Sequence, residues 1–361
     1  MYLLPISPYD TGSAVIMAKI NVGLDIGFSS IKAVSLVKDK DKYKLVSLGS
    51  IPSPQPGIAS DMDEDLEALA VTIKKLLTAA NIEQKEVVVA LPESKVFTRV
   101  IDDLPYLTDA ELASAIRYAA EEFIPMPLSD VNLNWQVLVR SEARGKNAKT
   151  VVLVIASPKN AALKYIKTLD KAGLRAKVLE TEILAVTRSL VGNDPFSPST
   201  LIMQLGVTTT DFAAVSKGLI WLTRSISTGG IALTRSLVQR FNFEMNQAEQ
   251  YKKIYGIVED QLEGKVFEAL KPIIDIIAGE GRRVIQAFET KYPLNPIKRV
   301  VVSGGGAKMP GLVVYLANIF GLEVQEADPW YSIEKEKDSV SKLAQEASSY
   351  SVAVGLALRE D

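Results

Sequence analysis

The chain of 361 residues contains no cysteine and no histidine. Without these residue types it cannot form a disulfide, a thiolate nucleophile, a Ser-His catalytic pair or an imidazole-bound zinc site. Most hydrolase chemistries are therefore excluded. The lack of cysteine also fits a reducing compartment, although exported proteins can lack cysteine too.

Long apolar runs are missing as well. A membrane span needs roughly 18 to 20 apolar residues, whereas the most apolar segments, 151–156 and 201–205, have the length of strands. Residues 1–16 lack a basic leader and contain Pro5, Pro8 and Asp10, which is unlike a signal peptide. We therefore expect a cytoplasmic protein.

Charge of one sign does not dominate, because 41 basic and 43 acidic side chains leave a formal net charge of -2. No overall field attracts the chain to nucleic acid, so we expect no nucleic-acid partner. The composition, 47% hydrophobic and 23% charged, is that of a soluble globular protein. A chain of this length favours two or three structural units.

Two stretches of the sequence, 22–32 and 201–211, share one pattern. Each contains an apolar strand, a polar residue two positions before a glycine, and paired hydroxyl residues two and three positions after that glycine. A second and a third strand follow in both halves, the third being 219–226 in the second half. We interpret this as an internal duplication; the alternative is a chance similarity of two hairpins.

The glycine turns in this pattern suit phosphate binding, because backbone N–H groups at such turns can approach phosphate oxygens. Two copies can clamp one nucleotide from opposite sides. Asp25 is suited to hold Mg²⁺ through water, and Ser29, Ser30 and Lys32 can donate to phosphate. A third glycine run, 304–306, lets the backbone approach a ligand closely. Taken alone, each motif is also compatible with a plain hairpin or tight turn.

Together the three motifs resemble the actin, Hsp70 and sugar-kinase superfamily and, within it, the PilM family of type IV pilus assembly proteins. FtsA-like cell-division proteins are a more distant resemblance. The similarity covers about 18–359. The segments that carry it are 24–34, 90–92, 97–99, 121–127, 227–230, 248–252 and 303–307.

The resemblance implies an α/β, actin-like fold of two duplicated lobes with an inserted α+β subdomain. It divides the chain into an irregular N-terminal extension (1–17), a first lobe (18–85), an inserted subdomain for partner binding (86–177) and a second lobe (178–361). The C-terminal helix is expected to return to the first lobe. The implied cofactors are ATP and Mg²⁺, with Asp25 as the metal-binding residue.

The residues expected to bind the nucleotide lie in five groups along the chain. In this resemblance Glu249 and Lys252 face the ribose and adenine. The full set is Asp25, Gly27, Ser29, Ser30, Lys32, Gln204, Gly206, Thr208, Thr209, Gly229, Gly230, Glu249, Lys252, Gly304, Gly305 and Gly306.

One departure concerns hydrolysis, because Gln204 stands where hydrolysing relatives carry an acidic residue. A neutral amide neither adds charge to a Mg²⁺ site nor acts as a base. Asp211 is near in sequence but lies beyond the turn. We therefore expect a nucleotide-binding scaffold with at most slow ATPase activity, and we assign no catalytic residue.

The family resemblance also implies a partner, the cytoplasmic tail of a PilN-like inner-membrane protein, captured by the inserted subdomain. This places the protein at the inner membrane through its partners. Other inner-membrane pilus components and motor ATPases are further expected partners, and self-association is left open. The candidate contacts, for which core packing is the alternative role, are Phe97, Arg99, Phe123, Ile124 and Trp135.

Other functions fit the same scaffold less well. An FtsA-like membrane anchor should end in a basic amphipathic helix, whereas this chain ends in Ala-Leu-Arg-Glu-Asp. A sugar kinase needs an acidic base, which Gln204 does not supply. A type II secretion platform stays open. As a separate hypothesis, residues 2–5 resemble a PilN tail, and residues 1–6 occupy the partner groove of the same chain or of a neighbouring copy; the alternative is a disordered tail or a misassigned start codon.

Overall fold

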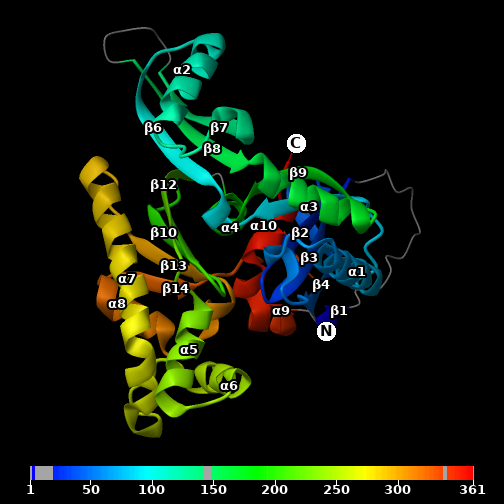
Figure 1. Ribbon diagram of the computed structural model, residues 1–361. Helices are drawn as coiled ribbons and strands as arrows, with labels where there is room; N and C mark the ends of the chain where they lie inside the picture. Colours follow the sequence, from blue (N-terminus) through cyan, green and yellow to red (C-terminus); the bar gives the residue numbers. More distant parts are fainter. Residues whose placement is uncertain (1, 5–18, 142–147, 193, 336–339, 361) are drawn as a thin grey trace.

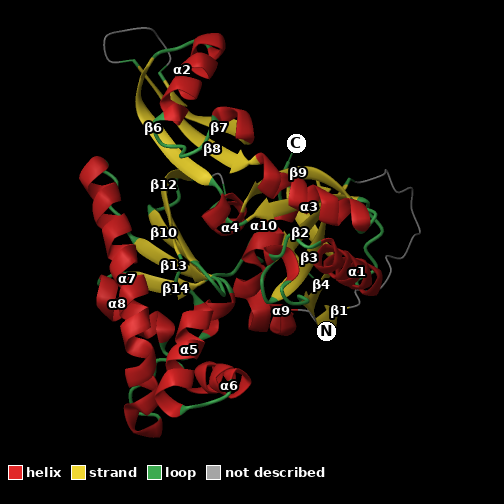
Figure 2. Cartoon of the chain, in the orientation of Figure 1, coloured by secondary structure: helices red, strands yellow, loops and turns green. Residues whose placement is uncertain are grey.

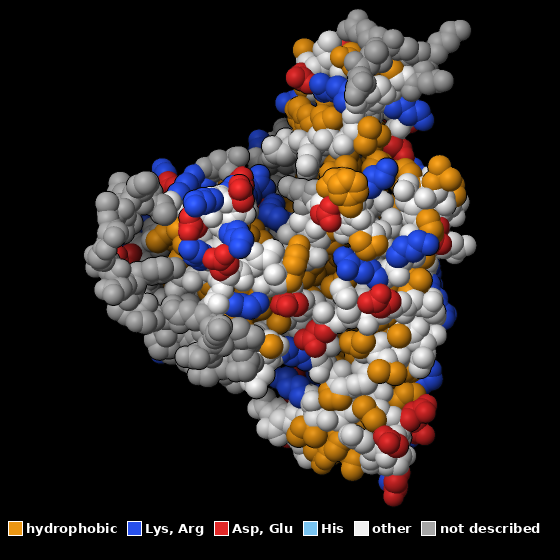
Figure 3. Space-filling view, turned by 180° about the vertical axis from the view of Figure 1, so that it is seen from behind, with side chains coloured by type: hydrophobic (Ala, Val, Ile, Leu, Met, Phe, Trp, Pro, Cys, Tyr) orange, Lys and Arg blue, Asp and Glu red, His pale blue; other side chains and the backbone are white. Residues whose placement is uncertain are grey.

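The computed structural model describes residues 2–4, 19–141, 148–192, 194–335 and 340–360. Two lobes stand side by side, and a smaller subdomain projects beyond them (Figure 1). Each lobe has a sheet with helices packed outside it (Figure 2). On the rear face, basic and acidic side chains are interspersed rather than gathered by sign (Figure 3).

The first lobe is built on a sheet with the strand order β1-β4-β3-β2-β5-β9. β2, β3 and β4 form an antiparallel meander, whereas β5 and β9 run parallel to β2. A short strand, β15 (Ile333–Glu334), also pairs with β4. The other strands are β1 (Tyr2–Leu4), β2 (Ile20–Ile26), β3 (Ser30–Asp39), β4 (Lys42–Pro52), β5 (Glu86–Leu91) and β9 (Arg175–Thr181).

Helices cover both faces of this sheet. α1 (Asp63–Ala79) and α3 (Lys159–Lys171) pack on one face, where Leu69 and Leu169 are fully buried. α10 (Ser351–Ala357) packs on the other face. The acidic first turn of α1 complements the helix dipole, and Asp63 also pairs with Lys171 at 3.0 Å.

The second lobe repeats this arrangement with the order β12-β11-β10-β13-β14. β10, β11 and β12 form the antiparallel meander, and β13 and β14 run parallel to β10. α5, α7 and α8 share one apolar core with the sheet. The elements are β10 (Thr200–Leu205), β11 (Thr210–Ser216), β12 (Leu219–Ile226), β13 (Arg299–Ser303), β14 (Glu323–Glu326), α5 (Gly230–Phe241), α6 (Met245–Tyr255), α7 (Lys265–Lys291) and α8 (Leu312–Phe320).

The inserted subdomain contains an antiparallel sheet in the order β6-β8-β7, with α2 on one face. α2 begins with a capping box in which Thr108 and Glu111 satisfy each other's backbone N–H groups. Val152 and Val154 of β8 are fully buried beneath this helix. The elements are β6 (Phe97–Pro105), α2 (Asp109–Glu121), β7 (Val131–Arg140) and β8 (Lys149–Pro158).

The predicted limits of this subdomain, 86–177, are wrong at both ends. β5 and β9 belong to the first-lobe sheet, and α3 packs against α1. The sheet of the subdomain therefore spans only 97–158. Alternating strands and helices give the same sequence pattern whether they form one sheet or two. The prediction therefore assigned strands of the first lobe to the subdomain.

The N-terminal extension is not wholly irregular, because Tyr2–Leu4 pairs antiparallel with β4, with Tyr2 opposite Ser50. This strand lies on the first lobe, so the hypothesis that it occupies the partner groove of its own chain is wrong for residues 2–4. Residues 1 and 5–17 lie outside the described part of the chain.

Two helical regions differ in their continuity. α7 is a single helix from Lys265 to Lys291, although it contains Pro272 and Gly279. The C-terminal helical region is divided into α9 (Val340–Glu346), a 3₁₀ turn at Ala347–Tyr350 and α10.

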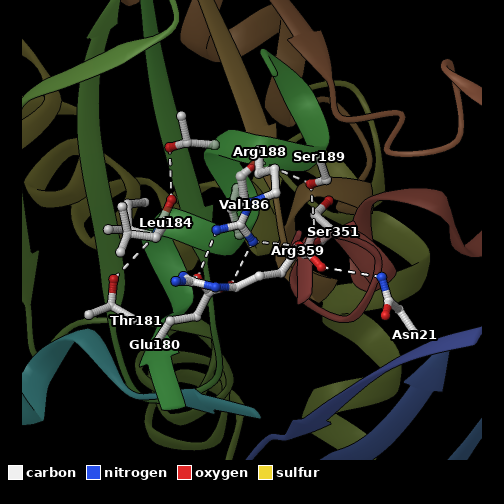
Figure 4. Close-up of polar contacts among 12 residues, drawn as sticks. Asn21, Glu180, Thr181, Leu184, Val186, Arg188, Ser189, Ser351 and Arg359 are labelled. Atoms are coloured by element: carbon white, nitrogen blue, oxygen red, sulfur yellow. Dashed lines mark hydrogen bonds and ion pairs between the residues drawn. The ribbon is translucent and has the colours of Figure 1, made fainter. Parts of the chain in front are cut away.

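The C-terminal helix, expected to return to the first lobe, lies against β2 and α4 (Glu182–Leu190). Glu180 accepts hydrogen bonds from Arg188 at 2.6 Å and from Arg359, and Arg188 also donates to the carbonyl of Gly355 at 2.6 Å (Figure 4). A Cβ atom on Gly355 would lie 1.8 Å from the carbonyl oxygen of Ala185. Glycine is therefore needed for this close crossing of α4 and α10.

Candidate functional site

A cleft of about 1690 Å³ lies between the two lobes and continues between the first lobe and the inserted subdomain. Its lining brings together residues from both hairpins and from the glycine run. Asp25, Thr208 and Gly305 face this one cavity. The lining contains every predicted nucleotide-binding residue except Gly229, whose Cβ position lies 2.8 Å from the carbonyl oxygen of Gly206, against the second hairpin turn.

The first hairpin turn joins β2 to β3. It is closed by a hydrogen bond from the Gly27 amide to the Ser30 carbonyl at 3.1 Å. Lys32 donates to the Ser30 hydroxyl at 2.7 Å and stands opposite Asp25 on the neighbouring strand. Burial raises the pKa of Asp25, and the charge of Lys32 partly opposes this shift. The carboxyl group of Asp25 thus lies beside the Lys32 ammonium group at the turn, an arrangement that suits a hydrated cation next to a phosphate.

The second hairpin turn joins β10 to β11 with the same geometry. The Gly206 amide donates to the Thr209 carbonyl at 3.0 Å. The first amide of α5, Gly230, donates to the Gly206 carbonyl at 2.9 Å, which attaches the positive end of that helix to the turn. Gln204 is buried, and its Oε1 atom has no hydrogen-bond partner among the described residues. This amide therefore remains available to a ligand.

The predicted adenosine side is organised by a buried lysine. Lys252 donates to Glu249 at 2.6 Å, to the Thr234 hydroxyl at 2.9 Å and to the Gly230 carbonyl at 3.0 Å. Burial lowers the pKa of Lys252, and its partner Glu249 opposes this shift. Burial alone would raise the pKa of Glu249, but Lys252 and Thr234 hold it below its ordinary value. An ionised carboxylate is thus fixed at the cleft wall.

The glycine run after β13 has three different environments. Gly304 has φ +87°, and a Cβ atom on it would lie 2.4 Å from the Leu205 carbonyl oxygen. A Cβ on Gly306 would lie 2.5 Å from the Leu205 side chain. Nothing lies within 4 Å of the Cβ position of Gly305, which faces the cleft. Two of the glycines therefore allow packing, and the third leaves space for a ligand.

Glu182 is an acidic cleft residue that the sequence reasoning missed. It begins α4, directly after the N-cap Thr181, and lines the cleft. Burial raises its pKa well above the ordinary value, and the charges of Asp211, Asp25 and Glu93 raise it further. The signal in the sequence was an expected strand followed directly by Thr-Glu at the start of a helix. Many ligand sites lie where a strand ends and a helix begins.

Two buried acids lie near Glu182. Burial raises the pKa of Glu93 to about 7, and the charge of Asp211 contributes. Burial also raises the pKa of Asp211 to about 6, against hydrogen bonds from Ser225 and Thr209. Within the described ranges, no group of three or more acidic side chains has the geometry of a metal site.

The predicted partner contacts lie elsewhere. The described residues that line the cleft include none of Phe97, Arg99, Phe123, Ile124 and Trp135. Ile124 is buried in the core of the subdomain, and Arg99 stacks on the Phe123 ring at 5.3 Å. Trp135 on β7 is 38% exposed.

The two lobes and the cleft between them define an actin-like protein. MreB 5 of Spiroplasma citri shares the fold with a TM-score of 0.51 and 16% identity, over 93% of this chain and 94% of that chain. The fold class predicted from the sequence is confirmed. Among the described helices, none is both long and apolar enough to cross a membrane.

The chain belongs to the family of type IV pilus assembly protein PilM, whose sequence profile matches residues 23–361. A solved PilM-PilN type IV pilus biogenesis complex matches with a TM-score of 0.82 and 26% identity, over 94% of this chain and 98% of that chain. FtsA of Neisseria meningitidis serogroup B is 23% identical over 351 residues, which cover 85% of this chain and 83% of FtsA. The predicted family, and with it a role in type IV pilus assembly, is confirmed.

Proposed function

We propose that this chain is an ATP-binding platform of the type IV pilus machine that holds the cytoplasmic tail of a PilN-like inner-membrane protein. The observation that carries the nucleotide part is the pair of equivalent turns, at Gly27 and Gly206, facing one cleft. The same-fold relative MreB 5 binds AMPPNP, which supports a nucleotide here.

The residues of the cleft suit ATP with Mg²⁺. Asp25 holds the hydrated cation, Ser29 and Thr208 donate to phosphate oxygens, and the α5 N-terminus adds its dipole. Glu249 accepts from the ribose hydroxyls. With a neutral amide at Gln204, we expect binding with at most slow hydrolysis.

The part of the cleft between the first lobe and the inserted subdomain, here called the arm, is the proposed site for the partner. Ala59 and Asn160 line its first-lobe side, and Lys95 and Met126 line the side of the subdomain. A PilN chain is present in the solved complex that this chain resembles. We propose that the tail lies in this arm, with Trp135 as the alternative contact on β7. Attachment to the inner membrane then comes through the tail.

A peptide from the N-terminus of a PilN-like protein tests this proposal. We expect it to bind the full chain in a fluorescence-anisotropy titration, and Asn160→Arg, an exposed change in the arm, to weaken binding about tenfold or more through steric exclusion. Trp135→Ala serves as the control and should bind as the wild type does. If Trp135→Ala weakens binding and Asn160→Arg does not, the contact lies on β7. If the peptide binds neither the wild type nor any variant, the proposed partner is refuted. Contacts with motor ATPases, other pilus components and second copies stay predictions.

A further inference from the structure

The inserted subdomain is an insertion in the first lobe by sequence, yet a polar contact fastens it to the second lobe. Asp102 of β6 accepts a hydrogen bond from the Tyr292 hydroxyl at 2.7 Å and pairs with the Lys291 ammonium at 2.9 Å. Both donors lie at the C-terminal end of α7. The end of this helix, β12 and β6 lie at the junction of the lobe and the subdomain (Figure 1).

Local structure fixes both sides of this contact. The pairing of β6 with β8 is irregular between Ile101 and Leu104, and such irregularities redirect side chains. The Tyr292 ring packs edge-on against Trp221 of β12, with centroids 4.9 Å apart. Burial alone would raise the pKa of Asp102, but its two partners hold it below the ordinary value. Asp102 is therefore ionised and directed at the second lobe.

A second contact lies at the base of the subdomain. Glu93, in the 3₁₀ turn that leads into β6, is buried and accepts a hydrogen bond from Thr98 at 3.1 Å. This turn touches β12, and the charge of Asp211 in β11 acts on Glu93. The segment that enters the subdomain thus meets the second lobe at two points.

We propose that Asp102, Tyr292 and Lys291 form a latch that makes the inserted subdomain follow the second lobe, so that closure of the lobes on a nucleotide reshapes the partner groove. The reason is geometric. One side of the groove, with Asn160, belongs to the first lobe, and the other, with Met126, belongs to the subdomain. A subdomain fastened to the second lobe moves relative to the first lobe when the cleft closes. This inference rests on the proposed function and concerns its regulation.

The latch is tested first by distances, without the peptide. Because the chain has no cysteine, single cysteines can be placed for spin labels at three exposed positions: Tyr118 on the subdomain, Val71 on the first lobe and Val314 on the second lobe. We expect Mg·AMPPNP to shift the 118–71 distance and leave the 118–314 distance unchanged. In Asp102→Ala, the 118–314 distribution should broaden and become nucleotide-dependent. If Asp102→Ala leaves both distributions as in the wild type, the latch is refuted.

Asp109→Ala is the matched control, because Asp109 pairs with Arg140 at 2.7 Å wholly within the subdomain. It should behave as the wild type. Tyr292→Phe keeps the ring contacts and removes only the hydroxyl, so it should reproduce part of the Asp102→Ala effect. Thermal unfolding of each variant identifies any that fails to fold.

Peptide affinity gives the second readout. We expect Mg·AMPPNP to change the affinity of the PilN-type peptide at least about fivefold in the wild type and in Asp109→Ala, the lower end of ordinary coupling. In Asp102→Ala the change should fall below about twofold. A fivefold change that persists in Asp102→Ala overturns the inference. If the peptide binds no variant, the proposed partner is refuted instead. The latch is then tested by the spin-label distances alone.

Discussion

The two hairpins that face the cleft share a backbone and differ in charge. Both turns close with a glycine amide donating to a carbonyl three residues on, at 3.1 Å and 3.0 Å. Across the strands, however, Asp25 stands opposite Lys32 in the first copy, whereas Gln204 stands opposite Asp211 in the second. The two lobes thus share the backbone of the turn, but the residue two positions before the glycine is acidic only in the first lobe.

The lobes also differ after the next parallel strand. In the first lobe β5 leads into the turn with Glu93 and then the inserted subdomain, whereas in the second lobe β13 leads into Gly304–306. Equivalent strand ends therefore lead into the inserted subdomain in the first lobe and into the glycine turn in the second lobe. Four predictions test this comparison.

The largest expected effect comes from giving the first lobe a residue of the second. Gly23 corresponds to Ile202 in the duplicated pattern, but a Cβ on Gly23 would lie 2.1 Å from the Ala353 carbonyl oxygen of α10. We expect Gly23→Ile to lower the free energy of unfolding by about 3 kcal/mol or more, because backbone cannot move aside easily. Chemical denaturation measures it.

Gly279→Ala is the control for that substitution. Its Cβ position is open and lies within α7, so alanine should raise stability by about 0.5 to 1 kcal/mol. Equal tolerance at both glycines contradicts the packing account of α10.

The next largest effect concerns the glycine turn. Gly305→Val should weaken ATP binding about 100-fold, because the side chain fills the open space beside the cleft. Stability should change little. Gly304→Ala should instead lower the stability, because Gly304 has a positive φ and a Cβ atom there would collide with Leu205. Isothermal titration and thermal unfolding of both variants separate the two roles, and ATP binding by Gly305→Val at wild-type strength contradicts the site.

A third effect depends on pH at the base of the subdomain. Burial, together with Asp211, raises the pKa of Glu93 from 4.5 to about 7 in the folded state. The folded state therefore binds the proton more tightly, and stability falls as pH rises from about 4.5 to about 7. Glu93→Gln should remove this loss. Above pH 7 its free energy of unfolding should exceed that of the wild type by on the order of 2 kcal/mol. Denaturation at pH 5 and pH 8 measures it. Glu323→Gln is the control, because Glu323 is exposed. Its free energy of unfolding should equal that of the wild type at both pH values.

The smallest effect separates the hairpins by their need for a cation. Asp25→Asn should weaken ATP binding about tenfold when Mg²⁺ is present and much less in its absence. Gln204→Ala should weaken binding by a similar factor under both conditions, because a neutral amide does not favour the cation. Parallel titrations with Mg²⁺ and with a chelator make this comparison. A matching Mg²⁺ dependence in the two variants contradicts the assignment of Asp25.

Local patterns predicted the hairpins well, because a turn of glycine and hydroxyl residues between apolar strands is specified by its own few residues. The repeat also predicted which loops face each other. Glu182 and Glu93 escaped prediction, since their burial and mutual charge effects arise only when strands from both lobes and α4 meet. For Glu182 the only local signal is its position at a helix start directly after a strand, and Glu93 has no signal of this kind.

The limits of the subdomain escaped prediction for a related reason. The pairing of β9 with β5 joins residues that lie far apart in the sequence, and only the complete sheet shows it. Ile124 illustrates the same limit at one residue. Its apolar side chain fits a partner contact or a core equally well in sequence, and the fold places it in the core.

The central claim is that both hairpins hold the phosphates of one nucleotide. Comparing ATP with AMP in Ser29→Ala and Thr208→Ala tests it most directly, because each variant removes one hydroxyl donor from one turn. We predict that each variant weakens ATP binding about tenfold and leaves AMP binding unchanged. ATP binding at wild-type strength in either variant contradicts the claim.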